Sequence, residues 1–393
     1  MADYLEDLIN IPVGPLGIIA MPGCEEMGKK LDFYLTKWRK EREHEHKETL
    51  NFRGYDRESF LIEVHCPRFG SGEAKGTIKR SVRGLDLYII SDVFNYGVEY
   101  KMYGREVPMS PDDHYADLKR IIAATQGKAK RINVIMPMLY EGRQHRRTGR
   151  ESLDSATALQ ELISLGVSNI ITFDAHDPRV QMAIPDHGFD NVMPTYQMIK
   201  ALVNNVPDVK IDPEHLMIIS PDEGAMARGI YFSSVLGVDL GMFYKRRDYS
   251  RIVNGKNPIV AHEYLGASAE GKTVFIADDI ISSGESMLDA ARRMKERGAT
   301  SFFCFATFAL FTNGLASFDK AYEVGIIDGV FGTNLTYCPD ELKNRPWFHQ
   351  VDVAKYAAYY ISALNHEVSI GTMIDPHDRV EALLAKKRAA ENA

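Results

Sequence analysis

Residues 272–298 read KTVFIADDIISSGESMLDAARRMKERG, and this stretch predicts the fold class of the chain. Its first part, Thr273–Ala277, is a short apolar run rich in β-branched and aromatic residues, which is typical of a buried strand. From Met287 onward apolar residues recur at helical spacing, and Gly298 predicts the end of that helix. The order of strand, loop of small residues and helix indicates an α/β domain.

Two carboxylates and a loop of small residues lie between the predicted strand and helix. Asp278 and Asp279 follow the point where the strand is expected to end, and residues 282–286 read SSGES. Backbone N–H groups at a helix N-terminus suit a phosphate, whereas the carboxylates suit the vicinal hydroxyls of a sugar, or a metal ion. The pattern therefore indicates a sugar-phosphate site. An N-capped helix preceded by a solvated acidic turn is the alternative interpretation.

Composition narrows the class of protein. The 393 residues are enough for two domains of ordinary size, with the apolar and charged fractions of a globular protein. A net charge of −7 argues against a dedicated nucleic-acid binder. The cysteines are widely spaced, which predicts neither a zinc site nor a disulfide framework. Because no apolar run reaches the length of a membrane span and acidic residues interrupt the N-terminus, we expect a cytoplasmic protein without a membrane partner.

Two further groups of polar residues follow predicted strands. Residues 143–147, RQHRR, come after a strand expected over 132–136. Guanidinium groups bind phosphate oxygens in pairs, so this loop is a candidate polyphosphate site, or else a basic face exposed to solvent. His176 lies among acids after a strand expected over 169–173, at the sheet edge where open α/β sheets bind ligands. It is a candidate metal ligand, with an exposed or structural histidine as the alternative.

A third basic group ends a strand expected over 239–244. Lys245 to Arg247 precede residues 248–258, which predict a mobile polar loop. Such cations either close over a phosphate-bearing substrate or belong to the surface.

The same order of elements occurs twice along the chain. Residues 131–176 and 272–308 both predict a strand, a polar loop, an amphipathic helix, a glycine and a second strand. We therefore predict two tandem α/β domains, each with a mostly parallel sheet flanked by helices. Their expected limits are 1–189 and 190–370, followed by a helical tail over 371–393.

These stretches together resemble ribose-phosphate pyrophosphokinase, also called PRPP synthetase, whose domains have the type I phosphoribosyltransferase fold. The resemblance extends over about residues 17–364 and rests on six segments in the order of the family. FIADDIISSGES is similar to the ribose-5-phosphate loop, FDAHDPRVQ to DLHxxQxQ, GRQHRR to ARQDR, ISPDEG to SPDxG, YKRR to the start of the catalytic loop, and RFGSGE to RFSDGE.

The resemblance implies a reaction in which the β,γ-pyrophosphoryl group of ATP passes to the C1 hydroxyl of ribose 5-phosphate, giving AMP and PRPP for nucleotide biosynthesis. It implies Mg²⁺ as cofactor and a homo-oligomer with shared active sites. The implied roles are Lys245 and Arg247 in catalysis, His176 and Asp222 on Mg²⁺, Arg143 and Gln144 on ATP, Phe69 and Glu73 on the adenine bound to a neighbouring subunit, Asp278 and Asp279 on the ribose hydroxyls, and Ser282, Ser283, Gly284, Glu285 and Ser286 on the 5-phosphate.

The chain also departs from the pattern of the family. Ser282 stands where the family usually has Asp, Glu285 where it usually has Gly, and His145 and Ser71 replace acids. A carboxylate near a 5-phosphate repels it. A pyrophosphokinase for a related ribosyl phosphate and a catalytically silent regulatory homologue are therefore the alternative functions. Residues 37–56 and 96–109 have no family counterpart, and the run RKEREHEHKE over 39–48 predicts a solvated helix end or surface insertion.

Overall fold

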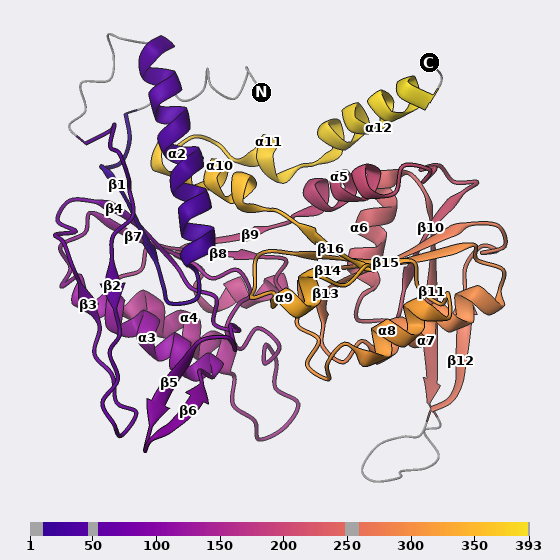
Figure 1. Ribbon diagram of the computed structural model, residues 1–393, viewed down its shortest axis with the longest axis horizontal. Helices are drawn as coiled ribbons and strands as arrows, with labels where there is room; N and C mark the ends of the chain where they lie inside the picture. Colours follow the sequence, from indigo (N-terminus) through magenta and orange to yellow (C-terminus); the bar gives the residue numbers. More distant parts are fainter. Residues whose placement is uncertain (1–10, 46–53, 248–258, 392–393) are drawn as a thin grey trace. The chain divides into compact units, whose positions relative to one another are not determined.

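The computed structural model describes residues 11–45, 54–247 and 259–391, which form two compact units. Unit 1 comprises the described residues up to Met193, with Asn334–Tyr337 and Asp352–Ile374. Unit 2 comprises the described residues from Pro194 to Thr333, with Cys338–Val351 and those from Asp375 onward. Each unit has its own sheet flanked by helices (Figure 1), which confirms the predicted α/β fold class. Within the described ranges, no helix is both long and apolar enough to cross a membrane.

The sheet of unit 1 is parallel throughout and has the strand order β1-β4-β7-β8-β9. Its central strands are buried along nearly their whole length, which is why they read as continuous apolar runs in the sequence. The strands are β1 (Leu16–Ala20), β4 (Asp86–Ile90), β7 (Arg131–Ile135), β8 (Asn169–Phe173) and β9 (Gly188–Val192).

Helices surround this sheet, and a core of Ile, Leu and Val residues from strands and helices lies beneath α3 and α4. Helix α2 packs against α10, a helix that comes from the far end of the chain (Figure 1). The helices of unit 1 are α2 (Glu25–Glu45), α3 (Pro111–Ala124), α4 (Asp154–Ser164), the short 3-10 helix η2 (Pro178–Ala183), α10 (Ala354–Asn365) and α11 (Gly371–Ile374).

Helix α3 shows how the local sequence fixes a helix start. Ser110 Oγ accepts the Asp113 N–H at 3.2 Å, and Asp113 Oδ2 accepts the Ser110 N–H at 3.0 Å. Pro111 occupies the first helical position. These contacts form the reciprocal capping box, and the proline suits the first turn because it lacks the N–H that would otherwise be unpaired there.

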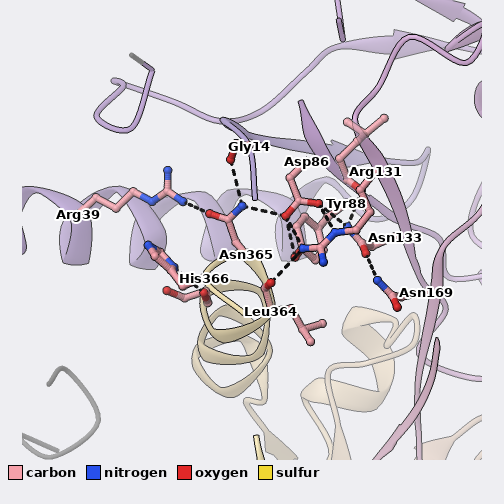
Figure 2. A network of polar contacts seen from close by, with 12 residues as sticks. Gly14, Arg39, Asp86, Tyr88, Arg131, Asn133, Asn169, Leu364, Asn365 and His366 are labelled. Carbon is pink, nitrogen blue, oxygen red and sulfur yellow. Dashed lines mark hydrogen bonds and ion pairs between the residues drawn. The ribbon is translucent and has the colours of Figure 1, made fainter. Parts of the chain in front are cut away.

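A buried polar network links α10 to the sheet of unit 1 (Figure 2). The carboxylate of Asp86, which is fully buried, accepts two hydrogen bonds of 2.7 Å from the Arg131 guanidinium. It also accepts hydrogen bonds from the side-chain amides of Asn133 at 2.9 Å and Asn365 at 2.8 Å. Arg39 of α2 donates to Asn365 Oδ1 at 2.6 Å. Because Arg39 is buried, the predicted solvation of the 39–48 run is wrong at its first residue.

Two small hairpins lie beside α3 in unit 1. Strands β5 (Glu99–Met102) and β6 (Arg105–Pro108) form an antiparallel hairpin. The hairpin lies within residues 96–109, one of the two segments that have no counterpart in the family pattern. Strands β2 (Val64–His65) and β3 (Thr77–Ile78) form the other antiparallel pair.

The sheet of unit 2 has the strand order β12-β11-β10-β13-β14-β15-β16. All pairs are parallel except β11 with β12, which is antiparallel. The strands are β10 (Leu216–Ser220), β11 (Asp239–Arg247), β12 (Ile259–Leu265), β13 (Thr273–Ile281), β14 (Ser301–Ala309), β15 (Gly329–Thr333) and β16 (Phe348–Val351).

Helix α7 places the predicted sugar-phosphate loop on the core of unit 2. Its apolar face, with Met287, Leu288, Ala291 and Met294, is buried in a cluster with residues of β13 and β14. Each such side chain contributes about 1.5–3 kcal/mol on full burial, apart from the smaller alanine. The helices of unit 2 are α5 (Thr195–Asn205), α6 (Met226–Leu236), α7 (Glu285–Glu296), α8 (Ala316–Glu323), α9 (Asp340–Lys343) and α12 (His377–Glu391).

Candidate functional site

In unit 2, the paired carboxylates lie inside strand β13 and not after its end. The strand continues to Ile281 because β14 pairs with it along its whole length, including Asp278 with Ala306. On the other side, pairing with β10 stops at Ile276. The expected strand end at Ala277 is therefore wrong. Past the last pair with β10, Asp278 lies at the carboxyl edge of the sheet, where ligands of open α/β sheets bind.

Both carboxylates face a guanidinium group. Arg228 Nη1 of α6 lies 3.3 Å from Asp278 Oδ1 and 3.5 Å from Asp279 Oδ1. Burial raises the pKa of Asp278 well above its ordinary value and the neighbouring Asp279 adds to this, whereas Arg228 opposes the rise. The sequence reasoning missed Arg228. The available signal was its position, early in the helix that follows β10 and the ISPDEG segment.

The loop after β13 turns sharply into α7. Gly284 has φ 73° and stands at the N-cap of the helix. A Cβ atom there would lie 2.3 Å from the Phe318 ring, so the turn requires glycine. Ser282 Oγ and Thr312 Oγ1 are 3.1 Å apart, which fixes the first residue of the loop. Strand, small loop and helix N-terminus occur in the predicted order, and the first turn of α7 provides an anion-binding geometry.

Glu285 is the first residue of α7 and is exposed. An acidic side chain at this position is stabilised by the partial positive charge of the helix N-terminus. The same partial charge attracts a phosphate, so Glu285 and a bound phosphate would compete for it. Exposure leaves the carboxylate in high-dielectric solvent, where charge repulsion is weak.

Asp222 stands directly after β10, the strand beside β13. Its Oδ1 accepts the N–H groups of Gly224 at 3.0 Å and Ala225 at 3.3 Å, which orients the carboxylate in a tight turn. Ser220 Oγ donates to the Asp222 carbonyl at 2.6 Å and closes the same turn. Asp222 therefore follows β10, and the paired carboxylates lie near the end of the neighbouring strand β13 of the same sheet.

The two predicted catalytic residues, Lys245 and Arg247, belong to unit 2. Both belong to β11, where Lys245 pairs with His262 and Arg247 with Ile259 of β12. Their side chains lie outside the described part of the structure, as does the whole of residues 248–258, for which a mobile loop was predicted.

In unit 1, Arg143 and Gln144 follow β7, and His176 follows the adjacent strand β8. Arg143 is exposed, while Gln144 donates from Nε2 to the Ser152 carbonyl at 3.0 Å. The rings of His145 and His176 have centroids 5.5 Å apart, so the two predicted loops meet at the edge of the sheet.

The acidic residues around His176 are held in fixed positions. Asp174 has φ 41°, an uncommon value for a residue other than glycine and one that concentrates at functional sites. Asp177 pairs with Arg179 and lies 3.3 Å from His145 Nε2. Hydrogen bonds from the Arg179 guanidinium lower the pKa of Asp177 to about 2. Asp177 thus remains a carboxylate, and His176 itself is exposed.

The segment with Phe69 and Glu73 forms a compact exposed turn. The Phe69 N–H donates to the Glu73 carbonyl at 2.7 Å, and the Phe69 side chain is 57% exposed. Arg68 anchors the turn through a buried ion pair with Asp117, at 2.7 Å. The aromatic ring is therefore available to a planar ligand from outside the unit.

Apart from Phe69 and Glu73 on their exposed turn, and Lys245 and Arg247 in β11, the predicted residues fall into two groups, one at the sheet edge of each unit. Unit 1 carries Arg143, Gln144 and His176, and unit 2 carries Asp222, Asp278, Asp279 and the loop of residues 282–286. Among the residues that the structure describes, no three His, Cys, Asp or Glu side chains are grouped as they would be around a metal ion.

Comparison with known proteins supplies two matching family models. One, described as the N-terminal domain of ribose phosphate pyrophosphokinase, matches residues 24–166. The other, described as the phosphoribosyl transferase domain, matches residues 193–329.

Curated relatives include proteins named ribose-phosphate pyrophosphokinase. That of Vibrio cholerae is 26% identical over 320 residues, which cover 80% of this chain and 92% of the relative. That of Synechococcus elongatus is 26% identical over 311 residues, 78% of this chain and 84% of the relative. The crystal structure of phosphoribosylpyrophosphate synthetase from Mycobacterium smegmatis superposes with a TM-score of 0.68 and 20% identity, covering 90% of this chain and 99% of that one. This likeness confirms the fold.

Proposed function

Because this chain belongs to the ribose-phosphate pyrophosphokinase family of enzymes, we propose that it transfers the β,γ-pyrophosphoryl group of ATP to ribose 5-phosphate. The C1 hydroxyl oxygen of the sugar attacks the β-phosphorus of ATP, and the bond from that phosphorus to the α,β-bridging oxygen breaks. The products are PRPP, AMP and the proton released from the hydroxyl.

The observation that carries the proposal is the arrangement at the end of β13. Asp278 and Asp279 lie near the end of β13, and Ile280 and Ile281 separate them from a small-residue loop that enters α7 at Gly284. Carboxylates accept hydrogen bonds from the 2- and 3-hydroxyls of a ribose, while Ser282, Ser283, Ser286 and the N-terminal amides of α7 receive its 5-phosphate. A sugar with adjacent hydroxyls and a terminal phosphate matches both parts.

The ATP side is assigned to the basic and aromatic residues of unit 1. Arg143 is exposed beside Gln144, and a guanidinium of this kind binds phosphate oxygens. Phe69 and Glu73, on an exposed turn, are assigned to the adenine bound to a neighbouring subunit. The proposed enzyme is accordingly a homo-oligomer.

Magnesium is the cofactor that this chemistry calls for. Mg²⁺ prefers oxygen ligands and is usually bound by one or two carboxylates together with substrate phosphates. The oriented carboxylate of Asp222 fits this donor set. His176, an exposed imidazole at a strand end, offers a nitrogen, and we assign it to Mg²⁺ bound at the phosphates of ATP on the basis of the family resemblance. When bound, the ion neutralises charge on the phosphates of ATP.

The remaining role is the stabilisation of charge on the transferring group. Phosphoryl-type transfer needs positioning and cancellation of charge more than covalent help from the protein. We assign this role to Lys245 and Arg247, whose positive charges match the negative charge on the transferring group.

AMP release from ATP and Mg²⁺, measured with and without ribose 5-phosphate, tests the proposal. We expect AMP only when the sugar phosphate is present, and we expect it to disappear in Asp222→Ala and after chelation of the metal. If ribose 5-phosphate gives no AMP, a panel of other ribosyl phosphates distinguishes an enzyme with a different acceptor from a silent regulatory homologue. Glu285 and Ser282, which depart from the family pattern in the predicted phosphate loop, are the reason to test other ribosyl phosphates as acceptors.

A further inference from the structure

The Arg228 side chain occupies an electrostatically unusual place in unit 2. It lies in the first turn of α6, where the helix dipole disfavours a positive charge. Its side chain is also only 11% exposed, so solvent does little to stabilise the positive charge. The charge is balanced instead by Asp278 and Asp279, which both approach the same nitrogen, Nη1.

The two carboxylates need such a partner. Adjacent residues of a strand point to opposite faces, yet Asp278 turns back so that its Oδ1 accepts the N–H of Asp279 at 2.9 Å. The side chains of Asp278 and Asp279 are 26% and 5% exposed. Two carboxylates this close, one buried and one half-buried, repel each other and favour sharing a proton. A protonated carboxyl loses acceptor capacity that a sugar diol requires.

We propose that Arg228 is a positioning residue, which holds the carboxyl groups of Asp278 and Asp279 oriented toward the 2- and 3-hydroxyls of the ribose. This inference rests on the proposed function, because it names how that site recognises its sugar. Arg228 itself acts through the carboxylates. The described charged groups that face Asp278 are Arg228 from α6 and Asp279 from its own strand, and its partner across β14 is the apolar Ala306.

Removal of the guanidinium tests this inference. In Arg228→Gln we expect kcat/KM for ribose 5-phosphate to fall about 10- to 100-fold, the range for loss of a charge-assisted hydrogen bond. The fall is expected in KM for the sugar, with KM for ATP changed less than about twofold, since ATP is assigned to other residues.

A comparison of sugars separates positioning from general damage. A site built to accept hydroxyl groups rejects an analogue that lacks one. We therefore expect wild-type protein to prefer ribose 5-phosphate to 2-deoxyribose 5-phosphate, and we expect Arg228→Gln to narrow that preference. Arg228→Lys keeps the charge but lacks the planar fork, so it should be intermediate in both measurements.

Arg293→Gln is the matched control. Arg293 lies on α7 and pairs with Asp289 at 2.9 Å, with both side chains partly exposed. Its replacement should change neither KM for the sugar nor the preference between sugars. Thermal unfolding of every variant shows which of them is folded.

The outcomes separate the two proposals. Wild-type protein that forms no AMP with any ribosyl phosphate refutes the proposed function. Wild-type activity together with a folded Arg228→Gln that keeps its sugar KM and its sugar preference refutes only the role of Arg228. If the Gln variant does not fold, a Lys variant indistinguishable from wild type refutes that role as well. Equal losses for both sugars and for ATP would show a purely structural residue, which also overturns the inference.

Discussion

Replacing Arg131 with methionine should lower the free energy of unfolding of unit 1 by about 3–5 kcal/mol, the cost of breaking a buried ion pair from one side. Asp86 is fully buried, and Arg131 supplies two of its hydrogen bonds, both of 2.7 Å (Figure 2). Methionine fills a similar volume but donates nothing. The Asp86 carboxylate would keep only neutral donors, namely Asn133, Asn365 and, at 3.2 Å, Tyr88.

The magnitude follows from those bonds. A hydrogen bond to a charged group contributes about 1.5–3 kcal/mol, so the two bonds lost to Asp86 account for at most about 6 kcal/mol. The bond from Arg131 to the Leu364 carbonyl, at 2.9 Å, is lost as well. The remaining amides offset part of this loss. Lys101→Met, in the β5–β6 hairpin, is the matched control because its pair with Glu106 is exposed, and we expect a change of at most about 1 kcal/mol.

Guanidinium unfolding, combined with hydrogen exchange of β4 and β7 amides, measures the effect on unit 1, since a protein with more than one unit need not unfold in one step. The double variant Asp86→Leu with Arg131→Met should recover part of the loss, because it removes the stranded charge as well. The reasoning is refuted if Arg131→Met costs no more than Lys101→Met.

Three further predictions concern the sites. Gly284→Ala should lower stability by about 1–2 kcal/mol from its positive φ alone, with a further loss from contact with Phe318, as measured by thermal unfolding; unchanged stability would contradict the turn geometry. Burial raises the pKa of Asp92 from 3.8 to about 7, so between these pH values the Asp92 carboxyl is protonated in the folded state and ionised in the unfolded state. The free energy of unfolding therefore falls as pH rises from about 4 to about 7. Asp92→Asn should remove that fall from the pH dependence of unfolding, and an unaltered profile would count against it. Lys245→Ala should lower kcat by about 10²–10³-fold with less change in ATP binding, and comparable turnover would exclude the assigned role.

The sequence predicted the elements whose signals are local. The strand expected over 169–173 coincides with β8, and the capping box of Ser110 and Asp113 at the start of α3 is a signal of the same local kind. Segments that read as strand, loop and helix in the sequence form those elements at the end of β13 as well. These patterns depend on neighbouring residues, so one sequence suffices to detect them.

What the sequence left out depends on residues that are distant along the chain. Strand β13 continues through Asp278 and Asp279 because β14 pairs with it, which no local pattern encodes. Arg39 looks solvated within a run of charges, yet Asn365 and the carbonyl of Tyr55 hold it in the interior. Arg228 lies 50 positions before Asp278, and only the folded sheet brings the two together.

The return of α10 to unit 1 bears on how the chain is made. A ribosome that has released residues 1–193 has supplied every strand of the first sheet, but not Asn365, one of the donors to Asp86. Arg39 at that stage also lacks its amide acceptor. The first sheet therefore lacks its contacts with α10 while most of unit 2 is synthesised. A fragment that ends after residue 193 would have every strand of the first sheet but would lack α10 and the donor Asn365. A fragment that extends to residue 374 would include all of unit 1, but it would also include most of unit 2.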